Sequence, residues 1–425
     1  MNQQFYGWKL VAVLWVILAI AMGFSVYGGS IINTHMITQL HLDRKSLGVA
    51  TGCFGLCMGM FSPLTGFLIQ RWGARKSLCI GMLIMALGAL ALATIVNTLA
   101  GVVIAYGLVM GFAAALGGLI PAQSIVSYWF RKRIALALTI VFTGATVGGF
   151  VATPLLTKAI AASNGNWRVG WFIVSALCAV SFCCAILFVR NKPSDIGQVQ
   201  DGVVEEDLPS ATKAGSQPAT NVYKTTKDWT FREAVWHPVF WFMIFGIACS
   251  NSATGMMLGH GVAHFKDLGH SPEMAAMFLS IVIVTGLVGK GIFAILGDRI
   301  EPRFLWSVAL IFMAIGMTLV VNATSNMELY VTGFLLGTMA SVSNLSMFTL
   351  AVNYFGKTAY APINGVISVF LTLVPAGMAI LAGIVFDHSG SYAPAFYSEA
   401  VICILAGLIM LFAVPPVRAL ASLET

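Results

Sequence analysis

The sequence alternates long apolar stretches with short polar connections along most of its length. A helix of about twenty apolar residues crosses the hydrocarbon core of a bilayer, so each stretch predicts one membrane-spanning helix. The stretches form two groups of six. The first group covers residues 7–33, 46–69, 77–97, 100–127, 134–160 and 168–190, and the second covers 238–262, 274–297, 303–322, 328–353, 361–386 and 392–414.

This pattern predicts an all-α membrane protein with about twelve transmembrane helices in two repeats. We expect an N-terminal six-helix bundle at residues 1–190 and a C-terminal six-helix bundle at 236–425. Residues 191–235 hold seven of the sixteen acidic residues, three prolines and almost no apolar run. Such a composition predicts a soluble, partly disordered linker.

The composition supports this class of protein. Hydrophobic residues make up 58% of the chain and charged residues only 9%, whereas a soluble domain carries roughly 25% charged residues. The net charge is +7, but no basic run interleaves with aromatic residues, so no nucleic-acid partner is expected. All eight cysteines lie in apolar segments, which predicts no disulfide framework.

The basic residues of the loops predict an orientation in the membrane. One set of loops holds Arg71, Arg75, Lys76, Arg131, Lys132, Arg133, Arg299, Arg303 and Lys357. The other set holds Arg44, Lys45, Lys158, Arg168 and Lys266. Because the richer set faces the cytoplasm in most membrane proteins, we expect cytoplasmic termini, a cytoplasmic linker and an inner (plasma) membrane location. The N-terminus has no small-residue cleavage site and is interpreted as part of the first helix rather than a signal peptide.

The two halves contain related loops. GFLIQRWGARK at residues 66–76 follows the second predicted helix, and AILGDRIEPR at residues 294–303 follows the eighth. Their alignment pairs Arg71 with Arg299 and Arg75 with Arg303. Parallel six-helix repeats are a known construction of secondary transporters.

The first loop resembles the motif G-x-x-x-D-[RK]-x-G-x-[RK]-[RK] of the major facilitator superfamily. The matching residues are Gly66, Arg71, Gly73, Arg75 and Lys76. Gln70 stands at the acidic position, whereas the second copy keeps the acid as Asp298 and has Glu301 in place of the glycine. In the family this loop makes charge contacts in the outward-open state. The resemblance implies a conformational role for the five matching residues and for Asp298, Arg299 and Arg303.

Smaller segments resemble the monocarboxylate transporter and oxalate–formate exchanger branch of that superfamily. They are YGWKL, YWFRKRIALAL, KPSDIGQVQDG, PVFW, YFG and FDHSGSYAPAF, in this order over nearly the whole chain. The resemblance implies a secondary active transporter of a small organic monocarboxylate, by proton symport or anion exchange. It also implies that the protein works as a monomer in the lipid bilayer. A transporter of this kind is not an enzyme, so no catalytic residue, cofactor or metal is expected.

Lys290 and Glu399 are the two full charges placed well inside the predicted helices. Lys290 precedes Asp298 by eight residues, about 12 Å at helical rise, which is far for its stem to reach the interface. An ionisable residue at such depth indicates a functional site. In the resembled families a basic residue of helix 8 binds the substrate carboxylate, which implies this role for Lys290. Glu399 lies near the start of the last helix and is expected to be an interfacial structural acid.

Two departures from the resembled families restrict the expected substrate class and mechanism. The oxalate–formate exchanger carries a second basic residue in helix 11, where Leu371 stands here. A single buried cation favours a substrate with one carboxylate. Animal monocarboxylate transporters carry an aspartate one turn before the basic residue of helix 8, where Gly286 stands here. The proton-carrying partner of their mechanism is therefore absent.

Five polar residues could complete a substrate site. They are Tyr27 and Asn33 in the first helix, Asn251 and His260 in the seventh, and Asn344 in the tenth. Tyr27 and Asn344 align approximately with substrate-contacting positions of the resembled exchanger. For all five, the alternative is a hydrogen bond between helices that stabilises the bundle.

Two other functions remain open. Leu119 stands at an aromatic position of the exchanger, and Gly144, Gly148 and Gly149 loosely resemble the glycine-rich helix 5 of drug/proton antiporters. These features would suit an exporter of a larger anionic metabolite or drug, although close helix packing also explains the glycines. A membrane sensor without transport activity is the third possibility, but the linker contains no recognisable signalling domain.

Overall fold

The computed structural model describes residues 5–40, 44–201 and 222–416. Helices are the only regular secondary structure in these three ranges. The chain groups into two compact units, the first of residues 1–216 and 364–372, the second of residues 217–363 and 373–425. Residues 202–221 of the expected linker lie outside the described ranges.

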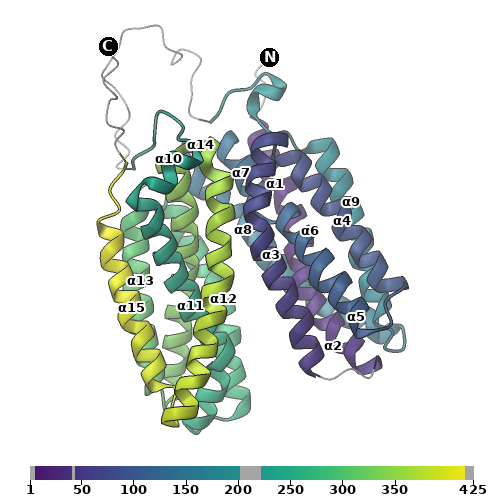
Figure 1. Ribbon diagram of the computed structural model, residues 1–425, viewed down its shortest axis with the longest axis vertical. Coiled ribbons are helices and arrows are strands. Elements are labelled where there is room, and N and C mark those ends of the chain that lie inside the picture. The colour runs from purple at the N-terminus through teal and green to yellow at the C-terminus, as the bar shows by residue number, and fades with distance from the viewer. Residues whose placement is uncertain (1–4, 41–43, 202–221, 417–425) are drawn as a thin grey trace. The chain divides into compact units, whose positions relative to one another are not determined.

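The first unit contains the first six spans (Figure 1). The first span consists of α1 (Gly7–Leu18), the π-helix η1 (Ala19–Gly28) and α2 (Gly29–Gln39), and the next two are α3 (Arg44–Trp72) and α4 (Ala74–Thr94). The fourth consists of α5 (Leu99–Val102), the π-helix η2 (Val103–Met110), α6 (Gly111–Gly117) and α7 (Leu119–Trp129). α8 (Ile134–Ala162) and α9 (Arg168–Phe188) are followed by the short 3₁₀ helix η3 (Pro193–Ile196).

The second unit begins with the short α10 (Phe231–Trp236). It continues with α11 (Pro238–Asp267), α12 (Pro272–Leu296), α13 (Pro302–Val321), α14 (Asn326–Ser389) and α15 (Ala393–Leu411). α14 has 64 residues, about 96 Å at helical rise, which is three times the hydrocarbon thickness. It is interrupted at Gly356, whose φ of 77° and ψ of −174° are not helical. Its two parts therefore supply two spans, as the sequence predicts.

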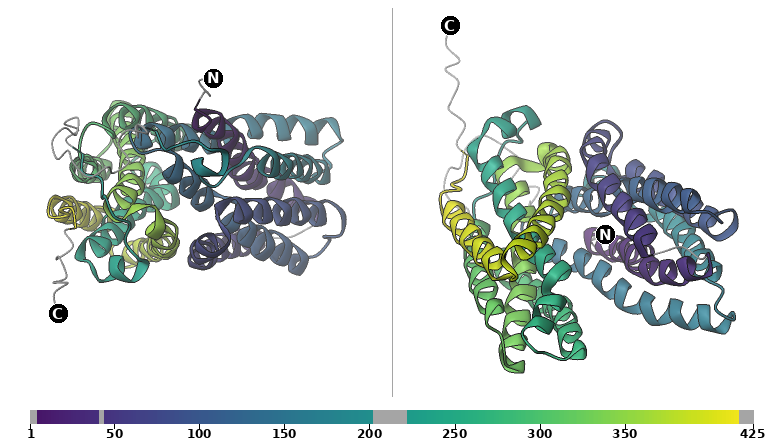
Figure 2. Two further views of the ribbon diagram at one scale, coloured as in Figure 1. Left: turned by 90° about the horizontal axis from the view of Figure 1, so that it is seen from above. Right: turned by 60° about the horizontal axis from the view of Figure 1, so that its bottom comes forward.

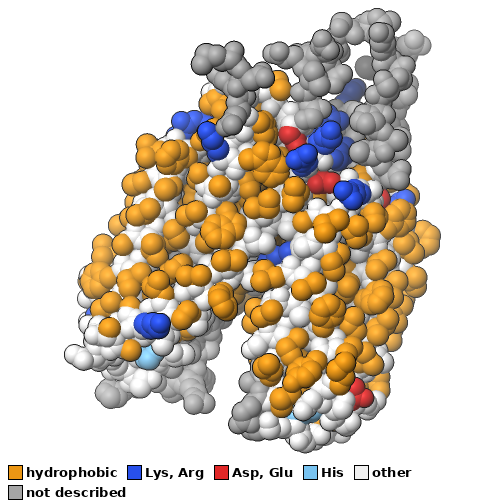
Figure 3. Space-filling view, turned by 180° about the vertical axis from the view of Figure 1, so that it is seen from behind, with side chains coloured by type: hydrophobic (Ala, Val, Ile, Leu, Met, Phe, Trp, Pro, Cys, Tyr) orange, Lys and Arg blue, Asp and Glu red, His pale blue; other side chains and the backbone are white. Residues whose placement is uncertain are grey.

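Within each unit the helices lie side by side as a bundle (Figures 1 and 2). Eleven helices of the described ranges, with α14 counted once, are long and apolar enough to cross a membrane. On the face drawn in Figure 3, hydrophobic side chains cover the sides of the helices and most Lys and Arg lie at one end. Large side chains such as Phe150 (78% exposed) point outward. Exposure of such an apolar surface to water is unfavourable, whereas contact with lipid tails is not. The expected all-α membrane fold is therefore confirmed.

Several helices begin at residues suited to that position. Ser271 caps α12, because its Oγ accepts the Met274 N–H at 3.3 Å. Ser325 and Glu328 form a reciprocal capping box at the start of α14. Such side chains satisfy backbone N–H groups that have no partner within the helix. The polar connections of the sequence thus define where the apolar helices start.

An aspartate anchors the loop between the fourth and fifth spans of the first unit. The Asp201 carboxylate accepts the backbone N–H groups of Arg131, Lys132 and Arg133, with distances of 3.0 Å for the last two. The Asp201 N–H in turn donates to the Trp129 carbonyl at 3.2 Å. The first part of the segment expected as a linker is therefore held against this bundle.

A second aspartate does the same in the second unit. The Asp228 carboxylate accepts the Lys357 N–H at 3.1 Å and the Thr358 hydroxyl at 2.6 Å. These residues follow Gly356, which adopts a positive φ and contacts Asp228 so closely that no side chain would fit. The turn WFRKR at 129–133 therefore hydrogen-bonds to the Asp201 carboxylate, and the corresponding turn of the second unit, YFGKT at 354–358, hydrogen-bonds to the Asp228 carboxylate.

The repeated arginines also have matching partners. Arg75 donates through Nη2 to the Ile186 carbonyl in the last turn of α9, the sixth span. Arg303 donates through Nη1 to the Leu411 carbonyl at 3.3 Å, at the end of α15. A guanidinium at a helix C-terminus satisfies terminal carbonyls and complements the helix dipole. Each arginine therefore caps the last helix of its own bundle.

Glu301, which replaces the motif glycine in the second copy, has its own contact. Its carboxyl group is largely buried and accepts the Tyr223 backbone N–H at 2.8 Å. This departure from the motif therefore attaches the chain before α10 to the loop between α12 and α13.

We predict that Asp201→Ala destabilises the protein by about 1–3 kcal/mol, because three backbone N–H groups lose a charged acceptor. Thermal unfolding of the purified protein in detergent measures this as a lower midpoint. Asp387→Ala, which removes an exposed acid near the end of α14, is the control. Equal midpoints for the two variants would contradict the anchoring role.

Candidate functional site

Lys290 is half-buried in α12. It directly follows a stretch of this helix, residues 286–289, that lies very close to α14. A methyl group added to Gly286 would lie 3.0 Å from the Ser341 Oγ, and one added to Gly289 would collide with the Thr338 carbonyl. A side chain at position 286 would therefore require Ser341 to move. The close approach explains why glycine stands at this position.

The contacts between α12 and α14 also define their register. Val282 meets Gly337, Gly286 meets Ser341, and Gly289 meets both Thr338 and Ser341, so the two helices run in the same direction. Lys290 directly follows Gly289 and therefore lies within about one turn of the level of Asn344, which is three residues beyond Ser341.

Asn344 is joined to α11 by a hydrogen bond. The Asn251 Nδ2 donates to the Asn344 Oδ1 at 3.5 Å and to the Ile247 carbonyl at 3.0 Å. The Asn344 Nδ2 donates to the Ala340 carbonyl at 2.8 Å. Both carboxamides are half-buried. The second unit therefore joins two of the predicted residues, Asn251 and Asn344, while Lys290 lies within about one turn of their level on the neighbouring α12. We name Lys290, Asn251 and Asn344 the polar cluster.

Tyr27 lies in the first unit, at the end of η1. Its side chain is 55% exposed, and its ring lies against Gly149 of α8, where a methyl group would approach the ring Cδ2 to 2.7 Å. π-helical segments within α-helices often occur at functional sites. The Tyr27 ring is thus packed against a glycine of another helix.

Glycines of α8 allow α8 to approach the first span closely. A methyl group at Gly148 would overlap the Ala19 backbone, and one at Gly144 would overlap the Trp15 carbonyl oxygen. η1 makes its most extensive contacts with α8. Packing therefore accounts for the glycine-rich fifth span.

Two predicted site residues lie apart from the polar cluster. Asn33 is buried inside the first unit, with its side chain next to the Tyr106 hydroxyl. The His260 Nε2 lies 2.8 Å from the Ala379 carbonyl oxygen, and its ring lies 5.0 Å from that of Tyr392. His260 is nine residues from Asn251, about 14 Å along α11. Both residues make contacts between helices.

The motif residues lie at the helix ends near the loops between α3 and α4 and between α12 and α13. Gly73 has a φ of 88° and separates α3 from α4, which explains its glycine. Gly66 is buried in α3, whereas Arg71, Lys76 and Arg299 are exposed. Asp298 follows the end of α12 at Leu296.

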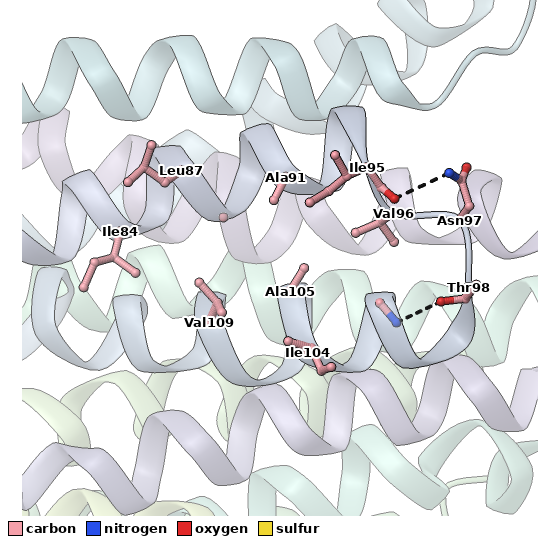
Figure 4. A pocket seen from close by; sticks show the side chains of 12 residues that line it. Ile84, Leu87, Ala91, Ile95, Val96, Asn97, Thr98, Ile104, Ala105 and Val109 are labelled. Atoms are coloured by element: carbon pink, nitrogen blue, oxygen red, sulfur yellow. Dashed lines mark hydrogen bonds between the residues drawn. The ribbon is translucent and has the colours of Figure 1, made fainter.

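A groove in the first unit lies between α4 and the fourth span. Figure 4 shows Ile84, Leu87 and Ala91 on one side and Ile104, Ala105 and Val109 on the other. Its polar side chains serve the local turn, because Thr98 accepts the Gly101 N–H at 3.2 Å and Asn97 contacts the Ile95 carbonyl at 3.4 Å. The apolar lining suits hydrocarbon rather than an anion.

Sequence reasoning missed the partner of Glu399. The Glu399 carboxyl group is 0% exposed, and its Oε1 lies 3.0 Å from the Ser252 Oγ of α11. Ser252 directly follows the candidate Asn251, but no sequence pattern relates residues 147 positions apart. Only the three-dimensional packing of α15 on α11 reveals this pair.

Two bundles of apolar helices, with a few polar side chains inside their spans, define a polytopic membrane transport protein. Residues 13–265 and 240–424 match the family model of the Major Facilitator Superfamily. The chain therefore belongs to this superfamily, and the predicted family is confirmed.

Among curated proteins, the chain is similar to monocarboxylate transporter 13 of Rattus norvegicus, with 24% identity over 387 residues, covering 89% of this chain and 81% of the relative. The Bos taurus protein of the same name is 27% identical over 257 residues, covering 60% of this chain and 52% of that relative. The chain thus spans about half of the length of the bovine relative. It is related to monocarboxylate transporters at low identity.

Among solved structures, the chain is similar to the fucose:proton symporter of Escherichia coli. The TM-score is 0.70 at 15% identity, and the match covers 97% of this chain and 100% of that chain. This likeness concerns the fold.

We predict that Gly148→Ala lowers the thermal midpoint, because the added methyl group forces α8 away from η1; overpacking of this kind costs about 1–3 kcal/mol. Gly52→Ala in α3 is the matched control, since a methyl group there meets no atom within 4 Å. A control variant that loses as much stability as Gly148→Ala would refute the packing explanation.

Proposed function

We propose that this protein is a secondary active transporter of a small organic monocarboxylate, by proton symport or anion exchange. The observation that supports it most is the half-buried Lys290 within about one turn of the level of the Asn251–Asn344 pair. An ammonium group in a poorly hydrated site attracts a carboxylate strongly and donates charge-assisted hydrogen bonds to it. The names of the curated relatives agree with this substrate class.

Charge balance favours one carboxylate over two. A monocarboxylate bound at Lys290 gives a pair without net charge, whereas a dicarboxylate leaves one negative charge to be buried, which is costly. The sequence places Leu371 where the oxalate–formate exchanger has its second cation. We therefore propose that dicarboxylates bind poorly.

The amides of the polar cluster can orient the substrate. Carboxamides donate and accept hydrogen bonds, so Asn344 and Asn251 suit a hydroxyl or keto oxygen of the substrate. Tyr27, whose side chain is partly exposed, remains a candidate. We also propose a conformational role for the eight motif residues of the two loops. They are Gly66, Arg71, Gly73, Arg75, Lys76, Asp298, Arg299 and Arg303.

The setting of the transporter follows from the sequence. We propose six-helix bundles at 1–190 and 236–425, an inner (plasma) membrane location, cytoplasmic termini and a monomeric transport unit. The excess of Lys and Arg in one set of loops supports the orientation. Export of a larger anion was suggested by two features, Leu119 and the glycines of α8. Because helix packing accounts for the glycines, Leu119 is the feature that still supports it.

We predict that Lys290→Gln abolishes uptake of labelled monocarboxylates into proteoliposomes, because the carboxylate loses its counter-charge. Lys290→Arg retains the charge and should keep part of the activity. Lys158→Gln, at an exposed lysine of α8, is the control for charge removal. Transport by Lys290→Gln at the wild-type rate would exclude Lys290 as the anchor.

We predict that Asn344→Ala raises the KM by about three- to tenfold, as expected for the loss of one hydrogen bond of about 0.5–1.5 kcal/mol. Uptake is measured over a range of substrate concentrations in the same proteoliposomes. Asn322→Ala, near the end of α13, should leave the KM unchanged. An unchanged KM in Asn344→Ala would remove Asn344 from the site.

A further inference from the structure

Glu399 is an acid in the interior of the second unit that the proposed substrate site does not use. Its side chain is 0% exposed. Its Oε1 lies 3.0 Å from the Ser252 Oγ and 3.9 Å from the Cys403 Sγ. Its Oε2 is buried and makes no hydrogen bond among the described residues. A carboxylate in this position would be poorly compensated.

The helices around Glu399 offer no counter-charge. The sequence places no Lys or Arg between residues 239 and 265 of α11, between 304 and 321 of α13, or anywhere in α15. The titratable groups nearest to the carboxyl are the thiols of Cys249 and Cys403. Further along α11, the His264 Nε2 lies 3.0 Å from the Val320 carbonyl oxygen, and the ring contacts Phe396. The His260 Nε2 lies against the Ala379 carbonyl oxygen. An ionised carboxylate buried without a cation is strongly disfavoured.

The contacts of Ser252 are compatible with the same protonation state, since its hydroxyl proton has three acceptors within reach: the Glu399 Oε1 and the Ala248 and Cys249 carbonyls. A hydroxyl group has a single proton to donate. The Ser252 Oγ lies 2.9 Å from the Ala248 carbonyl oxygen, the usual acceptor for a serine inside a helix. When that carbonyl receives the serine proton, the contact with Glu399 requires a proton on the carboxyl group. Glu399 then donates and Ser252 accepts.

We propose that Glu399 is a proton-binding site, occupied in this conformation, and that it binds and releases the proton coupled to transport. This proposal rests on the proposed transport function for its second part only. Ser252 faces Glu399, while the adjacent Asn251 contacts Asn344. A movement of α11 therefore changes the surroundings of the carboxyl and of the polar cluster together. The proton is released when such a movement exposes the carboxyl group to water.

This site differs from the arrangement implied by the animal relatives. Their proton-carrying acid precedes the basic residue of helix 8, a place taken here by Gly286, next to the Ser341 Oγ. Glu399 supplies a carboxyl from the last helix instead. A buried acid next to the helix that contributes Asn251 could thus replace the missing group.

Infrared difference spectroscopy of the purified protein in lipid nanodiscs tests the proton site without any substrate. The wild type should show the carbonyl band of a protonated carboxylic acid at neutral pH, and Glu399→Gln should lack it. Ser252→Ala should shift this band, because its hydrogen-bond partner is gone. Glu328→Gln, at an exposed acid that caps α14, should leave it unchanged. If the Glu399→Gln spectrum keeps the same carbonyl band as the wild type, the proposal is overturned.

Proteoliposomes test the coupling. Glu399→Gln imitates the protonated form, so it should keep substrate exchange at equal pH but lose accumulation driven by an inward proton gradient. Accumulation at the wild-type level would overturn the coupling. If the wild type moves no monocarboxylate at all, the proposed function fails, and the infrared result alone decides whether Glu399 binds a proton.

Discussion

Inside a bilayer, every polar group must find its partner within the protein, because lipid tails offer none. Because of this constraint the spans are helices, whose backbone groups hydrogen-bond within the helix. At the helix ends, side chains must bind the backbone groups that have no partner in the helix. Asp201 and Asp228 each receive the N–H groups of one turn. Arg75 and Arg303 each donate to the last turn of a sixth helix. The two repeats thus solve the same problem with the same types of residue at corresponding places.

The same constraint explains why so few polar residues inside the spans carry the functional proposal. A charge there is costly, so it persists where it has a use. We propose that Lys290 binds an anion, and charge balance favours one that carries a single charge. Glu399 avoids the cost by holding a proton. The proposed substrate site and the proposed proton site then share α11, on which Asn251 contacts Asn344 and the adjacent Ser252 contacts Glu399.

The sequence predicted the helices well because lipid-facing surfaces leave long apolar stretches; the predicted span 168–190 became α9 (Arg168–Phe188). It could not predict the π-helical turns at Ala19–Gly28, since hydrophobicity does not report the backbone hydrogen-bond register. For the site, it selected Asn251 and Asn344 individually but could not show that they meet, nor that Ser252 meets Glu399. Such pairs depend on how helices distant in sequence are packed. Within α11, His260 is nine residues from Asn251, and Asn33 is buried inside the first unit.

The central claim is that Lys290 binds a single carboxylate. Calorimetric titration of the purified protein with a panel of short monocarboxylates and the matching dicarboxylates tests it most directly, because binding is observed without transport. The account predicts that at least one monocarboxylate binds to the wild type, that its dicarboxylate counterpart binds at least tenfold more weakly, and that Lys290→Gln removes the binding. Equal affinity of Lys290→Gln and the wild type for that monocarboxylate would contradict it.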